Sequence, residues 1–180
     1  MNKVTHSVIG FLGCMLLSVV SGCDTSGQGE GIAGYRTGST FPKDVRTVAV
    51  PIFENESFYR EVEFELTEAL IKEIESRTPY KVTAGNVADT VLTGTITSIN
   101  QDLLSRTETG AIPQELQLVV VASFQWKNQR TGQIVRARSY VEGTGEYIPT
   151  ASVDQPLAIA RHKAVSELAE AIVSIMRDDW

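Results

Sequence analysis

The chain has 180 residues, of which 42% are hydrophobic and 21% are charged, and its 16 basic and 22 acidic residues give a net charge of −6. This composition is ordinary for a globular protein and excludes wholesale disorder, and the length fits one folded domain. The acidic balance argues against a nucleic-acid partner, which calls for a basic face. It also argues against attachment to anionic lipid through surface charge.

The first 22 residues, 1–22, are expected to be a secretory signal. Lys3 gives a positive start, and a mostly apolar run without charges follows over residues 8–20. Roughly 13 residues at 1.5 Å each reach about 20 Å, which is short of a hydrocarbon core of about 30 Å. A short apolar run behind a positive start is typical of a signal segment rather than of a membrane span.

The stretch Val20-Ser21-Gly22-Cys23 is similar to the lipobox of bacterial lipoproteins. In that motif small residues precede a cysteine whose sulfur carries a diacylglyceryl group. We therefore expect cleavage between Gly22 and Cys23, lipid on Cys23, and no other cofactor. Several acyl chains would hold the protein firmly on a membrane. The alternatives are an ordinary signal peptide that ends near Cys23, or a buried apolar strand with an incidental cysteine.

Residues 23–40 follow the expected cleavage site as the lipidated cysteine and a tether rich in glycine, serine and threonine. The loss of Lys3 leaves 15 basic against 22 acidic residues, so the mature chain carries a net charge of −7.

Residues 29–34 match the dinucleotide pattern GxGxxG. That pattern binds pyrophosphate only between a strand and a helix, so we interpret this stretch as tether. A single domain is expected over residues 41–180.

Hydrophobic periodicity predicts the elements of this domain in chain order. They are four strands at 47–53, 90–100, 116–126 and 134–142, a brief candidate strand at 81–83, helices at about 59–76 and 157–177, and a turn at 127–133. The run 116–126 alternates most regularly, and Pro51 places the end of the first strand near an edge or a turn. The order predicts an α+β fold: a two-layer sandwich with two helices on one face of an approximately four-stranded, mostly antiparallel sheet.

The residues offer little support for catalysis or metal binding. His162 is the one histidine beyond the signal segment, and it falls on the polar face of the second predicted helix. A solvated surface histidine explains it more simply than a general base does. The glutamates of the first helix are spread around its solvent side, and one histidine and one cysteine are too few for a zinc site. We expect no enzyme activity and no metal.

A basic cluster marks the predicted hairpin. Arg136 and Arg138 alternate onto one face of its second strand, and Lys127 and Arg130 lie near its turn. In an acidic domain these four groups are candidate contacts for phosphate or carboxylate. The alternative is an edge strand whose charges discourage aggregation.

Several stretches resemble the LPS-assembly lipoprotein family, LptE. The resemblance rests on Gly34-Tyr35-Arg36, Phe41-Pro42, the run from Thr47 to Asn55, Glu65 to Leu70, and Ala88 to Ile96. In the family a Gly-Tyr pair precedes a strand of the form Val-x-Val-Pro-x-Phe-x-Asn, and an Ala-Asp pair begins a later strand that reaches a glycine. The order and spacing of these motifs cover most of residues 34–175.

This resemblance implies a non-enzymatic lipoprotein on the periplasmic side of the outer membrane. It also implies a stable complex with the β-barrel translocon LptD, in which the lipoprotein acts as a plug and helps deliver lipopolysaccharide to the outer leaflet. The family binds lipopolysaccharide through basic residues of its strand and loop region. Lys127, Arg130, Arg136 and Arg138 are the counterparts by residue type.

Other interpretations stay open at this point. Asp24 directly after the cysteine is similar to the inner-membrane retention signal of enteric bacteria. The alternative function is a periplasmic lipoprotein of the curli-secretion or cell-wall-synthase-activator type, whose families also begin with a strand like Thr47–Asn55. Such a protein would bind a secretion pore or a peptidoglycan synthase. A hydrolase of envelope polymers would require an acid/base group that the sequence does not offer.

Overall fold

The computed structural model describes residues 41–42, 44–106, 113–149 and 154–177, which form two helices and a six-stranded sheet. The elements are β1 (Thr47–Ala49), β2 (Glu54–Asn55), α2 (Val62–Arg77), β3 (Lys81–Val82), β4 (Thr90–Arg106), β5 (Pro113–Asn128), β6 (Ile134–Tyr147) and α3 (Asp154–Ile175). Gly22, Cys23 and the glycine-rich tether lie outside the described residues.

The sheet is mixed, with the strand order β3-β1-β4-β5-β6, and β2 also pairs with β4. β4, β5 and β6 form an antiparallel meander, whereas β1 lies parallel to both β3 and β4. The expected sheet of approximately four, mostly antiparallel strands is confirmed for the long strands β4, β5 and β6, but the sheet has six strands and its short strands pair in parallel. The parallel pairing arises because α2 carries the chain back over the sheet between β1 and its neighbours, and such crossovers join parallel strands.

Pro51 divides the expected first strand into β1 and β2. Proline has no N–H to donate to a ladder, and the chain leaves β4 after Ala49 and pairs with it again at Glu54. Between the two strands the ring of Phe53 is buried against the bare backbone of Gly94. A Cβ atom at Gly94 would lie 2.8 Å from Cδ1 of that ring, so this glycine makes room for the phenylalanine.

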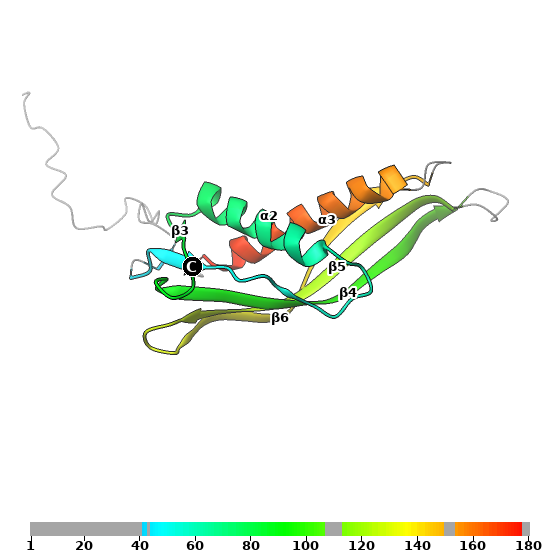
Figure 1. Cartoon of the computed structure of the whole chain (residues 1–180). Coiled ribbons are helices and arrows are strands. Elements are labelled where there is room, and N and C mark those ends of the chain that lie inside the picture. The colour runs from blue at the N-terminus through cyan, green and yellow to red at the C-terminus, as the bar shows by residue number, and fades with distance from the viewer. Residues whose placement is uncertain (1–40, 43, 107–112, 150–153, 178–180) are drawn as a thin grey trace, which may run out of the picture. The chain divides into compact units, whose positions relative to one another are not determined.

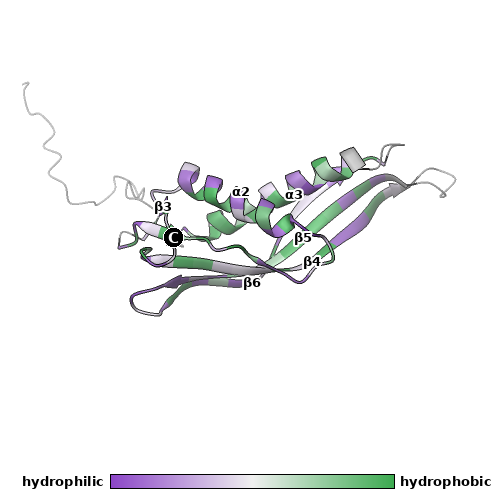
Figure 2. Ribbon diagram, viewed as in Figure 1, coloured by the Kyte–Doolittle hydropathy of each residue, from purple (hydrophilic) through white to green (hydrophobic). Residues whose placement is uncertain are grey.

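Both described helices cover one face of the sheet, and no helix of the described residues covers the other face (Figure 1). Apolar residues of the strands and helices meet between the two layers (Figure 2). In β5 the alternating side chains Leu118, Val120, Ala122, Phe124 and Trp126 are all buried, as the periodicity predicts. The opposite helix faces contribute Leu66, Leu70, Ile74, Ala164, Leu168, Ile172 and Met176. The two-layer arrangement is thus confirmed.

α3 lies directly on the backbone of β6. A Cβ atom at Gly145 would stand 2.7 Å from the carbonyl carbon of Ala160, and one at Gly143 would stand 2.8 Å from Cβ of Leu168. The Gly-x-Gly pair therefore lets the helix approach more closely than any side chain would permit. The sequence analysis predicted this strand only as far as Glu142. The structure extends β6 to Tyr147.

Aromatic residues fill the core near the C-terminal end of α3. The ring of Tyr80 contacts those of Phe41, with centroids 5.5 Å apart, and Trp126, with centroids 5.7 Å apart. The indole N–H of Trp126 donates to the buried hydroxyl of Thr90 at 3.0 Å, which satisfies both polar groups inside the core.

Neither helix in the described part of the chain is long and apolar enough to cross a bilayer.

Candidate functional site

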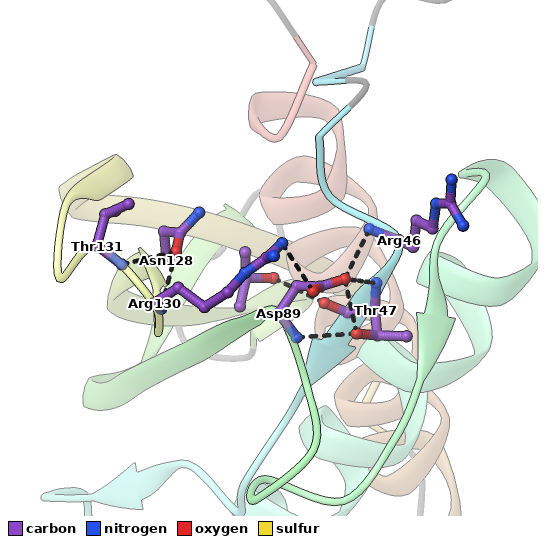
Figure 3. Close-up of polar contacts among 7 residues, drawn as sticks. Arg46, Thr47, Asp89, Asn128, Arg130 and Thr131 are labelled. Carbon is purple, nitrogen blue, oxygen red and sulfur yellow. Dashed lines mark hydrogen bonds and ion pairs between the residues drawn. The ribbon is translucent and has the colours of Figure 1, made fainter.

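Asp89 ties together three segments at one end of the sheet (Figure 3). Its Oδ2 accepts hydrogen bonds from the backbone N–H of Arg46 and of Thr47, each at 3.1 Å, and from the hydroxyl of Thr47 at 3.0 Å. The Thr47 hydroxyl in turn accepts from the N–H of Asp89 at 2.8 Å. Oδ1 pairs with the guanidinium of Arg130 at 3.0 Å. Asp89 therefore fixes the start of β1 and the β5–β6 turn relative to β4.

These contacts keep Asp89 ionised. The hydrogen bond from the backbone of Arg46, followed by that from the Thr47 side chain, lowers the pKa of the carboxyl group below its ordinary value.

On the other side of the ion pair, Asn128 orders the turn by accepting from the N–H of Arg130 at 2.9 Å and of Thr131 at 3.1 Å. The Arg130 guanidinium is therefore engaged in an intramolecular ion pair with Asp89.

Arg136 and Arg138 lie on the helix side of the sheet, because they pair across the ladder with the buried Trp126 and Phe124. Arg136 is half-buried, and its guanidinium donates to the backbone carbonyls of Val135 at 2.9 Å and of Arg177, just beyond α3, at 3.5 Å. Arg138 is exposed and donates to the carbonyl of Ala137 at 2.9 Å. Both arginines thus donate to carbonyls of their own edge strand, β6.

Lys127 lies on the opposite, helix-free face. It pairs with Val91, and the neighbouring pair Trp126 and Leu92 points to the helices. Lys127 lines an open groove of ≈ 650 Å³ whose walls include Ala49, Pro51 and Val91. An ammonium group beside an apolar floor suits an anionic amphiphile.

The structure therefore brings Arg136 and Arg138 together but separates them from Lys127, while Arg130 is paired with Asp89. A ligand role for the four residues stays a prediction. The alternation predicted the buried face of β5, but it did not fix the register of the hairpin, so it could not show that Arg136 and Arg138 share that face. Asp89 was seen only as part of the Ala-Asp pair of the family motif, and its role as the hub of this end of the sheet was missed.

The other titratable groups considered in the sequence analysis lie on the two helices. His162 is exposed on α3, as predicted. Glu65 of α2 is half-buried rather than solvated, and it pairs with Arg161 of α3 at 2.7 Å, so it joins the two helices. Among the described residues, no group of three or more histidine, cysteine, aspartate or glutamate side chains could hold a metal ion.

One surface feature had no sequence signal at all. Phe58, in the segment between β2 and α2, has a fully exposed ring, while Asn55 and Ser57 beside it form a hydrogen-bonded turn.

The described residues thus define a small α+β domain whose distinctive features are surfaces: a basic edge strand, a groove and an exposed aromatic loop. The family model LptE, described as Lipopolysaccharide-assembly, matches residues 45–176, so the chain belongs to this family. Comparison with curated protein sequences finds no match.

Solved structures with a similar arrangement include three proteins. The rare lipoprotein B of Shewanella oneidensis is 19% identical over 73% of this chain and 93% of its own, with a TM-score of 0.47. Lipoprotein B of Nitrosomonas europaea is 14% identical over 81% of this chain and 94% of its own, with a TM-score of 0.49. The PelC dodecamer of Paraburkholderia phytofirmans is 12% identical over 75% of this chain and 94% of its own, with a TM-score of 0.44.

Proposed function

We propose that the protein is a non-enzymatic outer-membrane lipoprotein that assists lipopolysaccharide transport as the plug and partner of an LptD-like β-barrel. Signal cleavage at Gly22-Cys23 and acylation of Cys23 anchor it to the membrane from the periplasmic side, and residues 24–40 act as the tether. The observation that carries this proposal is the family match across residues 45–176, which spans every helix and strand of the described domain.

Two features of the domain support a role by contact rather than by bond breaking. The one histidine beyond the signal segment is solvated on α3, and the half-buried Glu65 is committed to Arg161.

The exposed cations Lys127 and Arg138 are the better candidates for contact with lipopolysaccharide phosphates. Arg130 and Arg136 would first have to give up their contacts with Asp89 and with the backbone carbonyl of Arg177, respectively.

Isolation of the full-length protein from its native bacterium tests the proposal. A C-terminally tagged chain, extracted in mild detergent, should bring down an outer-membrane barrel of the LptD type in a stable, roughly equimolar complex. Mass spectrometry of the same preparation should find residues 1–22 removed and acyl chains on Cys23. A variant with Cys23→Ser should lose the acyl chains and appear in the soluble periplasmic fraction. An acylated protein isolated without any barrel would contradict the partner role.

A further inference from the structure

Phe58 is held outside the fold by an ordered loop. Its side chain is 103% exposed, and Phe64 in the first turn of α2 is 54% exposed. Single exposed hydrophobic residues are common on protein surfaces and need no explanation by themselves. The contacts and charges around Phe58 show whether its exposure needs an explanation.

The loop is fixed by the side chain of Asn55. Its Nδ2 donates to the carbonyl of Tyr59 and to the carboxylate of Glu63, both at 2.7 Å. Its Oδ1 accepts from the backbone N–H of Ser57 at 2.9 Å and from the Ser57 hydroxyl at 2.7 Å. One amide thus closes the loop on both sides of Phe58.

A second set of contacts ties the loop to the sheet. The phenol oxygen of Tyr59 accepts from Nε2 of Gln101 at 2.8 Å, and Oε1 of Gln101 accepts from the phenol of Tyr147 at 2.8 Å. This chain of hydrogen bonds runs from the loop through β4 to β6. The segment between β1 and α2 follows β4 before it turns back into the helix (Figure 1). Tyr59 is thus bound to the sheet, whereas its neighbour Phe58 stays fully exposed.

The chain after the loop is strained. Glu61, the residue before α2, adopts a left-handed backbone with φ of 72°, and its side chain makes no capping hydrogen bond. Residues other than glycine avoid this region. A loop that is closed by one amide, bound to β4 and through Gln101 to β6, and strained at its end holds the backbone of Phe58 in place without covering its ring. Preorganisation of this kind reduces the entropy lost on binding.

The charges around the loop indicate what its ring contacts. Glu54, Glu56 and Glu61 are exposed around Phe58, and Arg60 is the single basic residue between positions 54 and 64. An acidic border would be repelled by anionic lipid, which argues against insertion of the ring into a bilayer. It would complement an apolar protein pocket bordered by lysine or arginine, and buried aromatic anchors carry much of the binding energy of protein interfaces.

We infer that the loop from Asn55 to Glu61 is a docking element and that Phe58 inserts into an apolar pocket with a basic border on the partner protein. This inference rests on the proposed function, under which that partner is the β-barrel. Loss of a buried aromatic anchor typically weakens an interface about thirtyfold.

Three single substitutions in the full-length tagged protein, expressed at the native level, test the inference. Phe58→Ala should reduce the barrel recovered with the lipoprotein at least tenfold. Phe58→Trp keeps an aromatic ring and should retain recovery within about threefold of the unsubstituted protein. Ile159→Ala removes a side chain that is 70% exposed on α3 and should leave recovery unchanged. All three should unfold within about 2 °C of the unsubstituted protein, because both side chains lie outside the core.

The outcomes separate the inference from the proposed function. If the unsubstituted protein recovers no barrel, both fail. If it recovers the barrel and Phe58→Ala recovers equally much, the docking role is refuted while the proposed function stands. Equal losses in Phe58→Ala and Ile159→Ala would also refute it.

A photoreactive benzoylphenylalanine at position 58 provides the direct readout in intact cells. Crosslinking to the barrel polypeptide is the expected result. Crosslinking to lipid alone, or to a second copy of this chain, would overturn the inference.

Discussion

The contact between α3 and β6 gives the sharpest test of the fold. In Gly145→Ala the new Cβ would lie 2.7 Å from the carbonyl carbon of Ala160, where carbon atoms normally stay about 3.5–4.0 Å apart. The obstacle is backbone, so no side-chain rotation relieves it, and α3 must move out by about 1 Å. Overpacking alone costs about 1–3 kcal/mol. A gap of that size also removes a quarter to a half of the dispersion contacts of Leu168 and Ile172, which are fully buried.

We therefore expect Gly145→Ala to lower the free energy of unfolding by about 3 kcal/mol, and the melting temperature by about 10 °C. The assay is thermal unfolding of the purified full-length protein in detergent, followed by circular dichroism. Gly85→Ala is the matched control, since a Cβ at Gly85 meets nothing within 4 Å, and it should melt within about 1 °C of the unsubstituted protein. Gly132→Ala should have a melting temperature between those of the other two variants, because Gly132 has a φ of +72° but a Cβ there would meet open space. Equal melting temperatures for Gly145→Ala and Gly85→Ala would refute the close packing of α3 on β6.

Three further outcomes follow from the contacts. Thr90→Val leaves the buried indole N–H of Trp126 without its acceptor and should lower the free energy of unfolding by about 1–3 kcal/mol, measured by chemical denaturation. Arg136→Ala should cost about 1 kcal/mol, because it removes a cation from the C-terminal end of α3, whereas Arg138→Ala should change stability by less than about 0.5 kcal/mol. Because the folded-state pKa of Asp89 is lowered, its stabilising contribution should be present above the ordinary value of 3.8 and be lost as the pH falls through the lowered value. Asp89→Asn should remove that dependence; an unchanged acid-unfolding profile would contradict the role of the carboxylate.

Much of the architecture could be predicted because periodicity reports burial directly. The alternation of residues 116–126 identified the central strand and its buried face, and both helices were placed within a few residues of their observed bounds. Parallel pairing of β1 could not be predicted in the same way, since a strand of only three residues, Thr47–Ala49, carries no information on its neighbours. The predicted strand ended at Glu142, whereas β6 continues through Gly143 and Gly145, whose close approach to α3 is a tertiary contact that leaves no local pattern.

The candidate site was harder to predict for a related reason. Strand alternation placed Arg136 and Arg138 on one face but could not show that the helices cover it. Asp89 acts through backbone groups of Arg46 and Thr47, more than 40 residues away in the sequence, and such partners leave no local pattern. Phe58 follows no hydrophobic periodicity, because it belongs to no element and points away from the core.

Depletion of the protein in its native bacterium, with measurement of newly made lipopolysaccharide on the cell surface, tests the central claim most directly. A role in assembly with a barrel translocon predicts that surface lipopolysaccharide declines while newly made lipopolysaccharide accumulates in the envelope without reaching the outer leaflet. The unsubstituted gene should restore export. Export that continues at its normal rate after the protein has been exhausted would contradict the account.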